Sequence, residues 1–293
     1  MGKALTAGLC RKVVLTLEMI KFSHSVFALP FVLASVLLAE RGWPDVRVLL
    51  WIVLAMVSAR SAALAFNRLV DRHFDQRNPR TQGRVLPRRV ISERFVTAFT
   101  VASSAVLVGS AAMLNRWCLW LSPVALAVVL GYSYSKRFTV WCHAWLGVAL
   151  GIAPAAGWIA VRGDVDRSLL APLLMGAGVA LWVTGFDLIY ACQDSDFDRR
   201  EGLHSIPARW GEAAALRLSA ALHFGAVLCF AALIPLLDLF RVYPYGVVAT
   251  AGLLVAEHRI ARSRDLRRLE VAFFHVNSIV GVVYLAGVLG EVG

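Results

Sequence analysis

The sequence predicts an all-α integral membrane protein with about nine transmembrane helices. Hydrophobic residues make up 59% of the 293 positions and charged residues only 17%, well below the roughly 25% charged share of typical soluble domains. The apolar residues also gather into long runs, each near the roughly 20 residues that a helix needs to cross about 30 Å of hydrocarbon. Composition and run length therefore favour a chain that crosses a membrane repeatedly.

The nine runs follow one another along the whole chain. They fall near 22–39, 46–66, 94–114, 117–135, 140–161, 168–190, 213–237, 242–257 and 271–290. Several contain proline, which membrane helices tolerate where neighbouring groups satisfy the freed backbone. Basic residues precede the first run, and no small-residue cleavage site follows it. We therefore expect this run to be an uncleaved anchor and not a removed signal peptide.

The basic residues are sorted by membrane side. The net charge of +11 could suggest a nucleic-acid partner, but most of the 30 Lys and Arg fall in the N-terminal segment and in the loops after the even-numbered runs. By the positive-inside rule these segments are cytoplasmic, which places the C-terminus outside. We expect no nucleic-acid partner. The predicted setting is a multi-pass protein of the inner (cytoplasmic) membrane, with residues 1–20 as a cytoplasmic N-terminal segment.

Two acidic stretches end the second and sixth runs, on the same predicted side. The first reads NRLVDRHFD at 67–75 and the second YACQDSDFD at 190–198. If each helix continues into its stretch, residues four apart share one face. These residues are Asn67, Asp71 and Asp75 in the first stretch, and Tyr190, Asp194 and Asp198 in the second, with Asp187 one turn deeper. Paired carboxylates form the hard oxygen ligand set that Mg²⁺ favours, usually together with phosphate oxygens.

Basic residues follow both stretches and supply the charge that would hold an anion. They include Arg80 and Arg84 after the first stretch and Arg199 and Arg200 after the second, and Lys136 and Arg137 at the end of the fourth run lie on the same predicted side. A diphosphate bridged by Mg²⁺ needs carboxylates and cations close together. The isolated histidines His24, His143, His223 and His275 are instead expected to pack or to form hydrogen bonds between helices. The small residues of GVALGIAPAAGW and LLMGAGVALW are expected to let two helices approach closely.

From these motifs the chain resembles the UbiA superfamily of intramembrane prenyltransferases. The family's N-D-x-x-D-x-x-x-D is matched except that Arg68 replaces the second-position Asp, and D-x-x-Y-A-x-x-D-x-x-x-D is matched in full from Asp187 to Asp198. RTQGRVLPRR resembles R-T-x-x-R-P-L-P-x-G, and GLHSIPARWG resembles G-[IL]-K-S-x-x-x-x-x-G with His204 in place of Lys. The departures at Arg68 and His204 indicate a subgroup distinct from the best-known 4-hydroxybenzoate enzymes.

The resemblance implies one transmembrane prenyltransferase domain over residues 1–293, with the helices bundled around a central cavity. It also implies Mg²⁺-dependent transfer of a polyprenyl group from polyprenyl diphosphate, drawn from the lipid bilayer, to a hydroxylated aromatic acid. Asp71, Asp75, Asp194 and Asp198 are the expected catalytic metal ligands, with Asn67 beside them. The expected diphosphate contacts are Arg80, Arg84, Lys136, Arg137 and Lys21. The expected acceptor or supporting residues are Tyr132, Tyr134, Asp187, Tyr190, Arg60 and His204.

Three functions stay open at this point. The favoured one prenylates 4-hydroxybenzoate for ubiquinone-type quinone synthesis, and an alternative prenylates a dihydroxynaphthoate-type ring for menaquinone by a futalosine-type route. Arg60 and His24 are both candidates to bind the acceptor carboxylate. An ion-coupled transporter could also use intramembrane acids, but we expect it to place them near the bilayer midplane and to lack a phosphate clamp.

Overall fold

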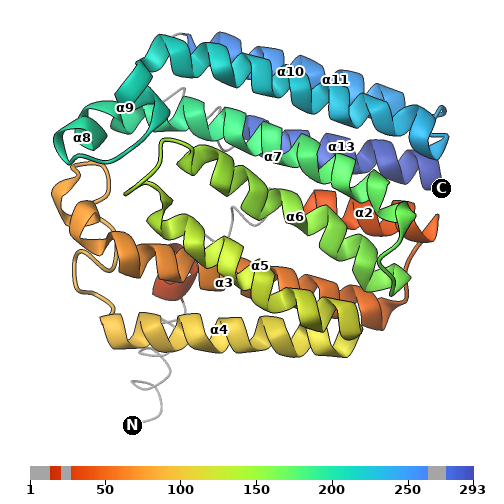
Figure 1. Cartoon of the computed structure of the whole chain (residues 1–293), viewed down its shortest axis with the longest axis horizontal. Coiled ribbons are helices and arrows are strands. Elements are labelled where there is room, and N and C mark those ends of the chain that lie inside the picture. The colour runs from red at the N-terminus through yellow and green to blue at the C-terminus, as the bar shows by residue number, and fades with distance from the viewer. Residues whose placement is uncertain (1–13, 21–27, 263–274) are drawn as a thin grey trace.

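The computed structural model describes residues 14–20, 28–262 and 275–293, and every element assigned in these ranges is helical. The long helices run lengthwise beside one another, and the short helices α8 and α9 sit at one end of the bundle (Figure 1). The long helices are α2 (Leu29–Glu40), α3 (Val46–Arg77), α4 (Glu93–Leu114), α5 (Arg116–Ser135), α6 (Cys142–Arg162), α7 (Leu170–Ala191), α10 (Glu212–Leu237), α11 (Tyr243–Ala261) and α13 (Asn277–Val292). The short ones are η2 (Arg167–Leu169), η3 (Cys192–Asp194), α8 (Ser195–Arg200) and α9 (Ile206–Trp210).

The predicted fold class, an all-α membrane protein, is confirmed, whereas the count of nine spans is not. Within the described ranges, six helices are long and apolar enough to cross a membrane: α3, α4, α5, α6, α10, and α7 together with its continuation to Arg200. Helices α2 and α13 are apolar but shorter, with 12 and 16 residues. The first predicted run begins at residue 22, and its first six residues lie outside the described ranges.

Local sequence signals set several helix ends. The side chain of Asp45 accepts hydrogen bonds from the backbone N–H groups of Arg47 and Val48 at the start of α3. Ser92 and Asn115 cap α4 and α5 in the same way. These side chains satisfy N–H groups that have no partner inside the helix. Gly163 ends α6 with φ of 72°, a left-handed conformation that glycine adopts without strain.

The packing divides the bundle into two parts. Helices α2, α7, α10, α11 and α13 surround an apolar core whose largest side chains are aromatic: Phe31, Trp182, Phe230, Tyr243 and Tyr284. Helices α3, α4 and α5 pack against one another, and α5 also packs against α6. Helices α6 and α7 therefore form the shared wall between the packed core and a pocket described below.

Close approach of α6 and α7 confirms the expectation from their small residues. A Cβ atom on Gly151 would lie 2.6 Å from the carbonyl oxygen of Gly176, and one on Gly176 would lie 2.3 Å from that of Gly151. A Cβ atom on Gly147 would lie 2.4 Å from the carbonyl oxygen of Ala180. The two backbones are thus in direct contact, as small residues permit in membrane helices.

Candidate active site

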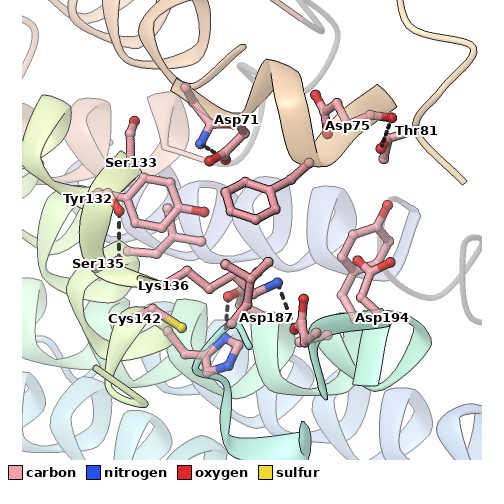
Figure 2. Close-up of a pocket in the computed structure, with 18 of the residues that line it drawn as sticks. Asp71, Asp75, Thr81, Tyr132, Ser133, Ser135, Lys136, Cys142, Asp187 and Asp194 are labelled. Atoms are coloured by element: carbon pink, nitrogen blue, oxygen red, sulfur yellow. Dashed lines mark hydrogen bonds and ion pairs between the residues drawn. The ribbon is translucent and has the colours of Figure 1, made fainter. Parts of the chain in front are cut away.

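One pocket lies at the end of the bundle that carries α8 and α9, which we call the motif end. Its walls are the last turns of α3, α5 and α7, the first turns of α6, the η3–α8 segment and the loop after α3. Its volume is about 290 Å³, near the lower limit of small-molecule sites. All four aspartates expected to bind metal line it, and Figure 2 shows Asp71, Asp75, Asp187 and Asp194 among its side chains.

The first acidic motif lies on an unbroken helix, as expected. Helix α3 continues to Arg77, so Asn67, Asp71 and Asp75 follow one face toward the pocket. The Asn67 amide donates a 2.8 Å hydrogen bond to Asp71 Oδ2. Arg84 Nη1 donates to both oxygens of Asp75 at 2.7 and 2.8 Å. Asp71 Oδ1 lies 3.2 Å from Arg137 Nη2.

The second acidic motif differs from the expected continuous helix. Helix α7 ends at Ala191, a 3₁₀ turn covers Cys192–Asp194, and α8 begins at Ser195. A 3₁₀ turn has three residues per turn, so the four-residue spacing holds only approximately here. Tyr190, Asp194 and Asp198 nevertheless all line the pocket. The break turns Asp194 toward the loop that follows α3.

That loop joins the two motifs directly. Arg80 Nε donates to Asp194 Oδ1 at 2.9 Å, Arg80 Nη2 also bonds Asp194 Oδ2, and Arg80 Nη1 donates to the Tyr190 hydroxyl at 2.7 Å. The Asn78 amide adds a 3.0 Å bond to Asp194 Oδ1. Burial works to lower the pKa of Arg80, but its bond to Asp194 outweighs this and the pKa stands above its ordinary value.

Asp198 is the most enclosed of the four carboxylates. Its side chain is 1% exposed, and Lys136 Nζ lies 2.8 Å from Oδ2. Apart from this ion pair, both carboxylate oxygens of Asp198 are buried without a hydrogen-bond partner. Burial works to lower the pKa of Lys136, but the carboxylates of Asp198 and Asp194 raise it above its ordinary value. The lysine therefore stays charged beside the aspartates.

These donors suit a hard divalent cation that shares its coordination with a ligand. Within the described ranges, no three His, Cys, Asp or Glu side chains gather into a ready-made metal site. Mg²⁺, however, usually takes only one or two carboxylates and completes its octahedron with water and phosphate oxygens. Each motif offers two carboxylates, and the unpartnered oxygens of Asp198 are suitable ligands. The four cations around them could hold an anion at the same place.

The deeper wall of the pocket combines apolar side chains with two cations, the partly buried Arg60 and the buried Arg68. Leu64, Leu146, Leu150, Val183 and Phe186 line it. Arg60 also lines it, and its Nε atom is buried without a hydrogen-bond partner. Arg68 is 7% exposed and makes a long 3.4 Å bond to Asn67 Oδ1. Buried guanidinium groups with so few bonds favour an anionic ligand.

Two of the predicted site residues are absent from the pocket lining, and a third lies outside the described residues. Tyr132 lines it, but Tyr134 does not: its ring is 46% exposed and packs edge-on against Phe66 at 5.8 Å. The His204 side chain is also absent from the lining, and its backbone N–H donates to the Lys136 carbonyl at 2.7 Å. Lys21, like His24, lies outside the described residues.

His143 is the residue whose position was not foreseen. It makes the expected bond between helices, but its partner is Asp187 in the pocket wall, at 2.7 Å. An isolated histidine in an apolar run gives no sign of such a partner, which lies 44 residues further along the chain. The only sequence signal for this site was the spacing of Asp187, which placed its carboxylate one helical turn before Tyr190 and on the same face of the helix.

Comparisons with known proteins agree with this geometry. Residues 28–279 match the model of the UbiA prenyltransferase family. A 4-hydroxybenzoate octaprenyltransferase from Nitrosospira multiformis is 32% identical over 259 residues, covering 86% of this chain and 85% of that protein. The solved structure of a UbiA homologue from Aeropyrum pernix superposes with a TM-score of 0.84 at 34% identity, covering 92% of this chain and 98% of the other. A homologue from Archaeoglobus fulgidus, solved bound to DMAPP and Mg²⁺, has a TM-score of 0.71 at 18% identity, with coverage of 94% and 98%.

Proposed function

The chain belongs to the UbiA prenyltransferase family, and from this premise we propose that it transfers a polyprenyl group from polyprenyl diphosphate to a ring carbon of 4-hydroxybenzoate. The observation that carries the proposal is the meeting of two aspartate motifs and their cations on one pocket whose deeper wall holds the unpaired Arg60. The relative from Nitrosospira multiformis supports the choice of acceptor. The product would enter ubiquinone-type quinone synthesis.

Mg²⁺ is the proposed cofactor, as the metal bound in the Archaeoglobus fulgidus homologue suggests. Asp71 and Asp75 would hold one ion with Asn67 beside them, and Asp194 and Asp198 a second. When bound, the metal would neutralise the charge that develops on the leaving diphosphate. Asn67 supports this role because its amide fixes Asp71 Oδ2. Asp71 Oδ1 is contacted by Arg137 at 3.2 Å, and a metal would take the place of this contact.

Four cations would hold the diphosphate itself. Arg80, Arg84, Lys136 and Arg137 each lie within ion-pair distance of one motif aspartate. A diphosphate bridged to the same carboxylates by metal would therefore lie within their reach. Such preorganised charges stabilise a leaving group because they need little reorganisation during reaction. Tyr190 would hold Arg80 in place through its hydroxyl.

The acceptor would occupy the deeper part of the pocket. Arg60 precedes Asp71 by 11 residues on α3, about 16 Å at 1.5 Å per residue, and Asp187 precedes Asp194 by two turns. Arg60 would bind the acceptor carboxylate, Asp187 would accept a hydrogen bond from the ring hydroxyl, and Tyr132 would contact the ring. The apolar side chains between them exclude water, which would otherwise capture a carbocation.

The bonds change in a simple order. The C–O bond of the prenyl diphosphate breaks, and its electron pair leaves on the diphosphate held by the arginines and Lys136. The ring carbon beside the hydroxyl supplies the pair for the new C–C bond to the allylic carbon. That ring carbon then releases its proton to the departed diphosphate, and aromaticity returns. The hydrogen bond from the hydroxyl to Asp187 increases the electron density of the ring while the new bond forms.

The membrane explains how so long a substrate reaches so small a pocket. Each buried CH₂ group favours hydrocarbon by about 0.8 kcal/mol, so the polyprenyl tail would stay in lipid while its diphosphate enters the pocket. The basic loops at the motif end favour a cytoplasmic position for this end. The aspartates lie at helix ends beside the four cations proposed to bind diphosphate, which we call the diphosphate clamp. An ion-coupled transporter would need neither this position nor these cations.

A product assay tests this proposal. The purified full-length protein would be incubated with Mg²⁺, one polyprenyl diphosphate and a panel of hydroxylated aromatic acids, and products identified by mass. We expect prenylated 4-hydroxybenzoate, formed only with a divalent metal present. If only a dihydroxynaphthoate-type acid is prenylated, that acid is the acceptor, and the product would belong to menaquinone synthesis. No prenylated acid at all, or transfer unaffected by metal chelation, would contradict the proposal.

A further inference from the structure

His143 and Asp187 form a buried pair in the pocket wall that stands apart from the diphosphate clamp. His143 lies in the first turn of α6, and its Nδ1 is 2.7 Å from Asp187 Oδ2 on α7. The histidine side chain is 3% exposed, whereas the Asp187 side chain is 19% exposed and lines the pocket. The carboxylate therefore reaches the pocket, and the imidazole supports it from behind.

Asp187 is paired differently from the other pocket carboxylates. Asp71, Asp75, Asp194 and Asp198 each pair with an arginine or lysine from a loop at the motif end. Those long side chains can move with a ligand. The partner of Asp187 is a short, rigid ring on a helix that contacts α7 backbone to backbone. The geometry therefore fixes the carboxylate of Asp187 in place, whereas the other four carboxylates can exchange partners.

The bond leaves half of the carboxylate for a ligand. Asp187 accepts from His143 through Oδ2, and the hydrogen bonds of the described residues do not engage its Oδ1. A carboxylate with one oxygen held and one free is a directed acceptor, because the held oxygen sets the plane of the group. Thr184, one turn earlier on α7, lies 3.4 Å through its hydroxyl from the His143 carbonyl and ties the two helices at the same level.

We propose that His143 is a positioning residue for the aromatic acceptor, acting through Asp187. By donating Nδ1–H to Oδ2, it aims Oδ1 at the ring hydroxyl and keeps the carboxylate as an acceptor. The inference rests on the proposed function, because it assumes that a hydroxylated ring occupies the deeper pocket. It adds a residue that the aspartate motifs do not contain.

Substitutions at position 143 test this role. His143→Leu keeps an apolar side chain of similar bulk without the donor, and His143→Asn keeps an N–H donor close to the position of Nδ1. Loss of a buried hydrogen bond to a charged group is worth about 1.5–3 kcal/mol, or roughly 10- to 100-fold. We expect His143→Leu to lower kcat/KM for the acceptor by that factor, while KM for the polyprenyl diphosphate changes less than about 3-fold. His143→Asn should recover most of the loss.

A double-mutant cycle with Asp187→Asn separates positioning from a general loss of structure. If His143 acts through Asp187, His143→Leu should have little further effect in the Asp187→Asn background. The thermal unfolding temperature of each variant is recorded, so that losses are compared among folded proteins. Additive losses, equal losses for both substrates, or failure of Asn to recover activity would overturn the proposal. A wild-type protein that prenylates no acid would instead overturn the proposed function.

Discussion

Two clusters of polar side chains in the described part of the bundle are paired in different ways. The pocket at the motif end joins carboxylates to long cationic side chains from loops. The second cluster, which we call the interhelical network, lies among α7, α10, α11 and α13 and consists of Trp182, His223, Glu257, His258 and Asn277. Four of its side chains, all except that of His258, are at most 3% exposed.

The side chains of the network bond mainly to partners on neighbouring helices, although Glu257 Oε2 is buried without a hydrogen-bond partner. Trp182 Nε1 donates to Asn277 Oδ1 at 2.8 Å, and the Asn277 amide donates to Glu257 Oε1 at 2.7 Å. His223 Nε2 lies 3.2 Å from the Trp182 carbonyl, and its Nδ1 lies 3.0 Å from His258 Nε2. One neutral tautomer of His223 serves both contacts, donating from Nε2 and accepting at Nδ1. These bonds join four helices to one another.

The comparison teaches what separates a ligand site from a structural cluster in a membrane bundle. Both clusters bury ionisable groups, so burial alone does not distinguish them. In the pocket, the carboxylates face a cavity and their partners are flexible cations that a diphosphate can recruit. In the network, the partners are fixed on neighbouring helices and bind one another. We therefore expect substitutions in the pocket to change activity and substitutions in the network to change stability.

The largest effect is expected at the second acidic motif. Asp194→Asn removes a charge that would hold metal and should lower turnover by about 10³-fold or more, since such electrostatic stabilisation is worth several kcal/mol. The same loss is expected for Asp71→Asn. Asp196→Asn is the matched control, because the Asp196 side chain is 85% exposed and pairs with Arg199 at the surface. Near-normal prenyl transfer by Asp194→Asn, measured as product per folded protein, would contradict the assignment.

A smaller effect is expected at the deeper wall. Arg60→Met keeps the length of the side chain and removes its charge, so KM for an acidic acceptor should rise by about 10- to 100-fold, the worth of a charge-assisted hydrogen bond. KM for the polyprenyl diphosphate should stay within about 3-fold. Steady-state kinetics with each substrate varied in turn checks both values. If KM for the polyprenyl diphosphate rises and KM for the acceptor does not, Arg60 binds the diphosphate and not the acceptor.

The contact between α6 and α7 links the two clusters, because α7 carries Asp187 and Trp182. Gly151→Ala places a methyl group against the Gly176 carbonyl and should cost about 1–3 kcal/mol of stability. It should also weaken acceptor binding, because His143 and Asp187 lie across the same interface. Gly252→Ala is the control, since nothing lies within 4 Å of a Cβ atom there. Equal unfolding temperatures for the two variants would contradict the close contact.

The smallest effect is expected in the network. Asn277→Ala removes the bonds to Trp182 and Glu257 and should cost about 0.6–1.7 kcal/mol, the range for hydrogen bonds between membrane helices. Kinetic constants of the folded protein should match those of wild type. Thermal unfolding in detergent and a parallel activity assay measure the two quantities. A clear loss of kcat without loss of stability would show that the network takes part in the reaction.

The sequence predicted the helices and the motif residues well, because both leave local signals. Apolar runs located the long helices, and the four-residue spacing placed Asp71 and Asp75 on one face of α3. The 3₁₀ turn at Cys192–Asp194 was missed, since nothing in an apolar run ending in acids marks a change of helix type. The pairing of His143 with Asp187 was missed because it depends on how α6 packs against α7. Tyr134 is absent from the pocket lining, because it is two residues from Tyr132 and therefore on another face of α5.

The account depends most on both motifs binding one diphosphate. An experimental structure of the full-length protein with Mg²⁺ and an unreactive polyprenyl thiodiphosphate tests this directly. We predict one diphosphate in the pocket, bridged by metal to Asp71 and Asp75 on one side and to Asp194 and Asp198 on the other, with Arg80 and Lys136 in contact. A diphosphate bound by a single motif, or outside this pocket, would contradict it.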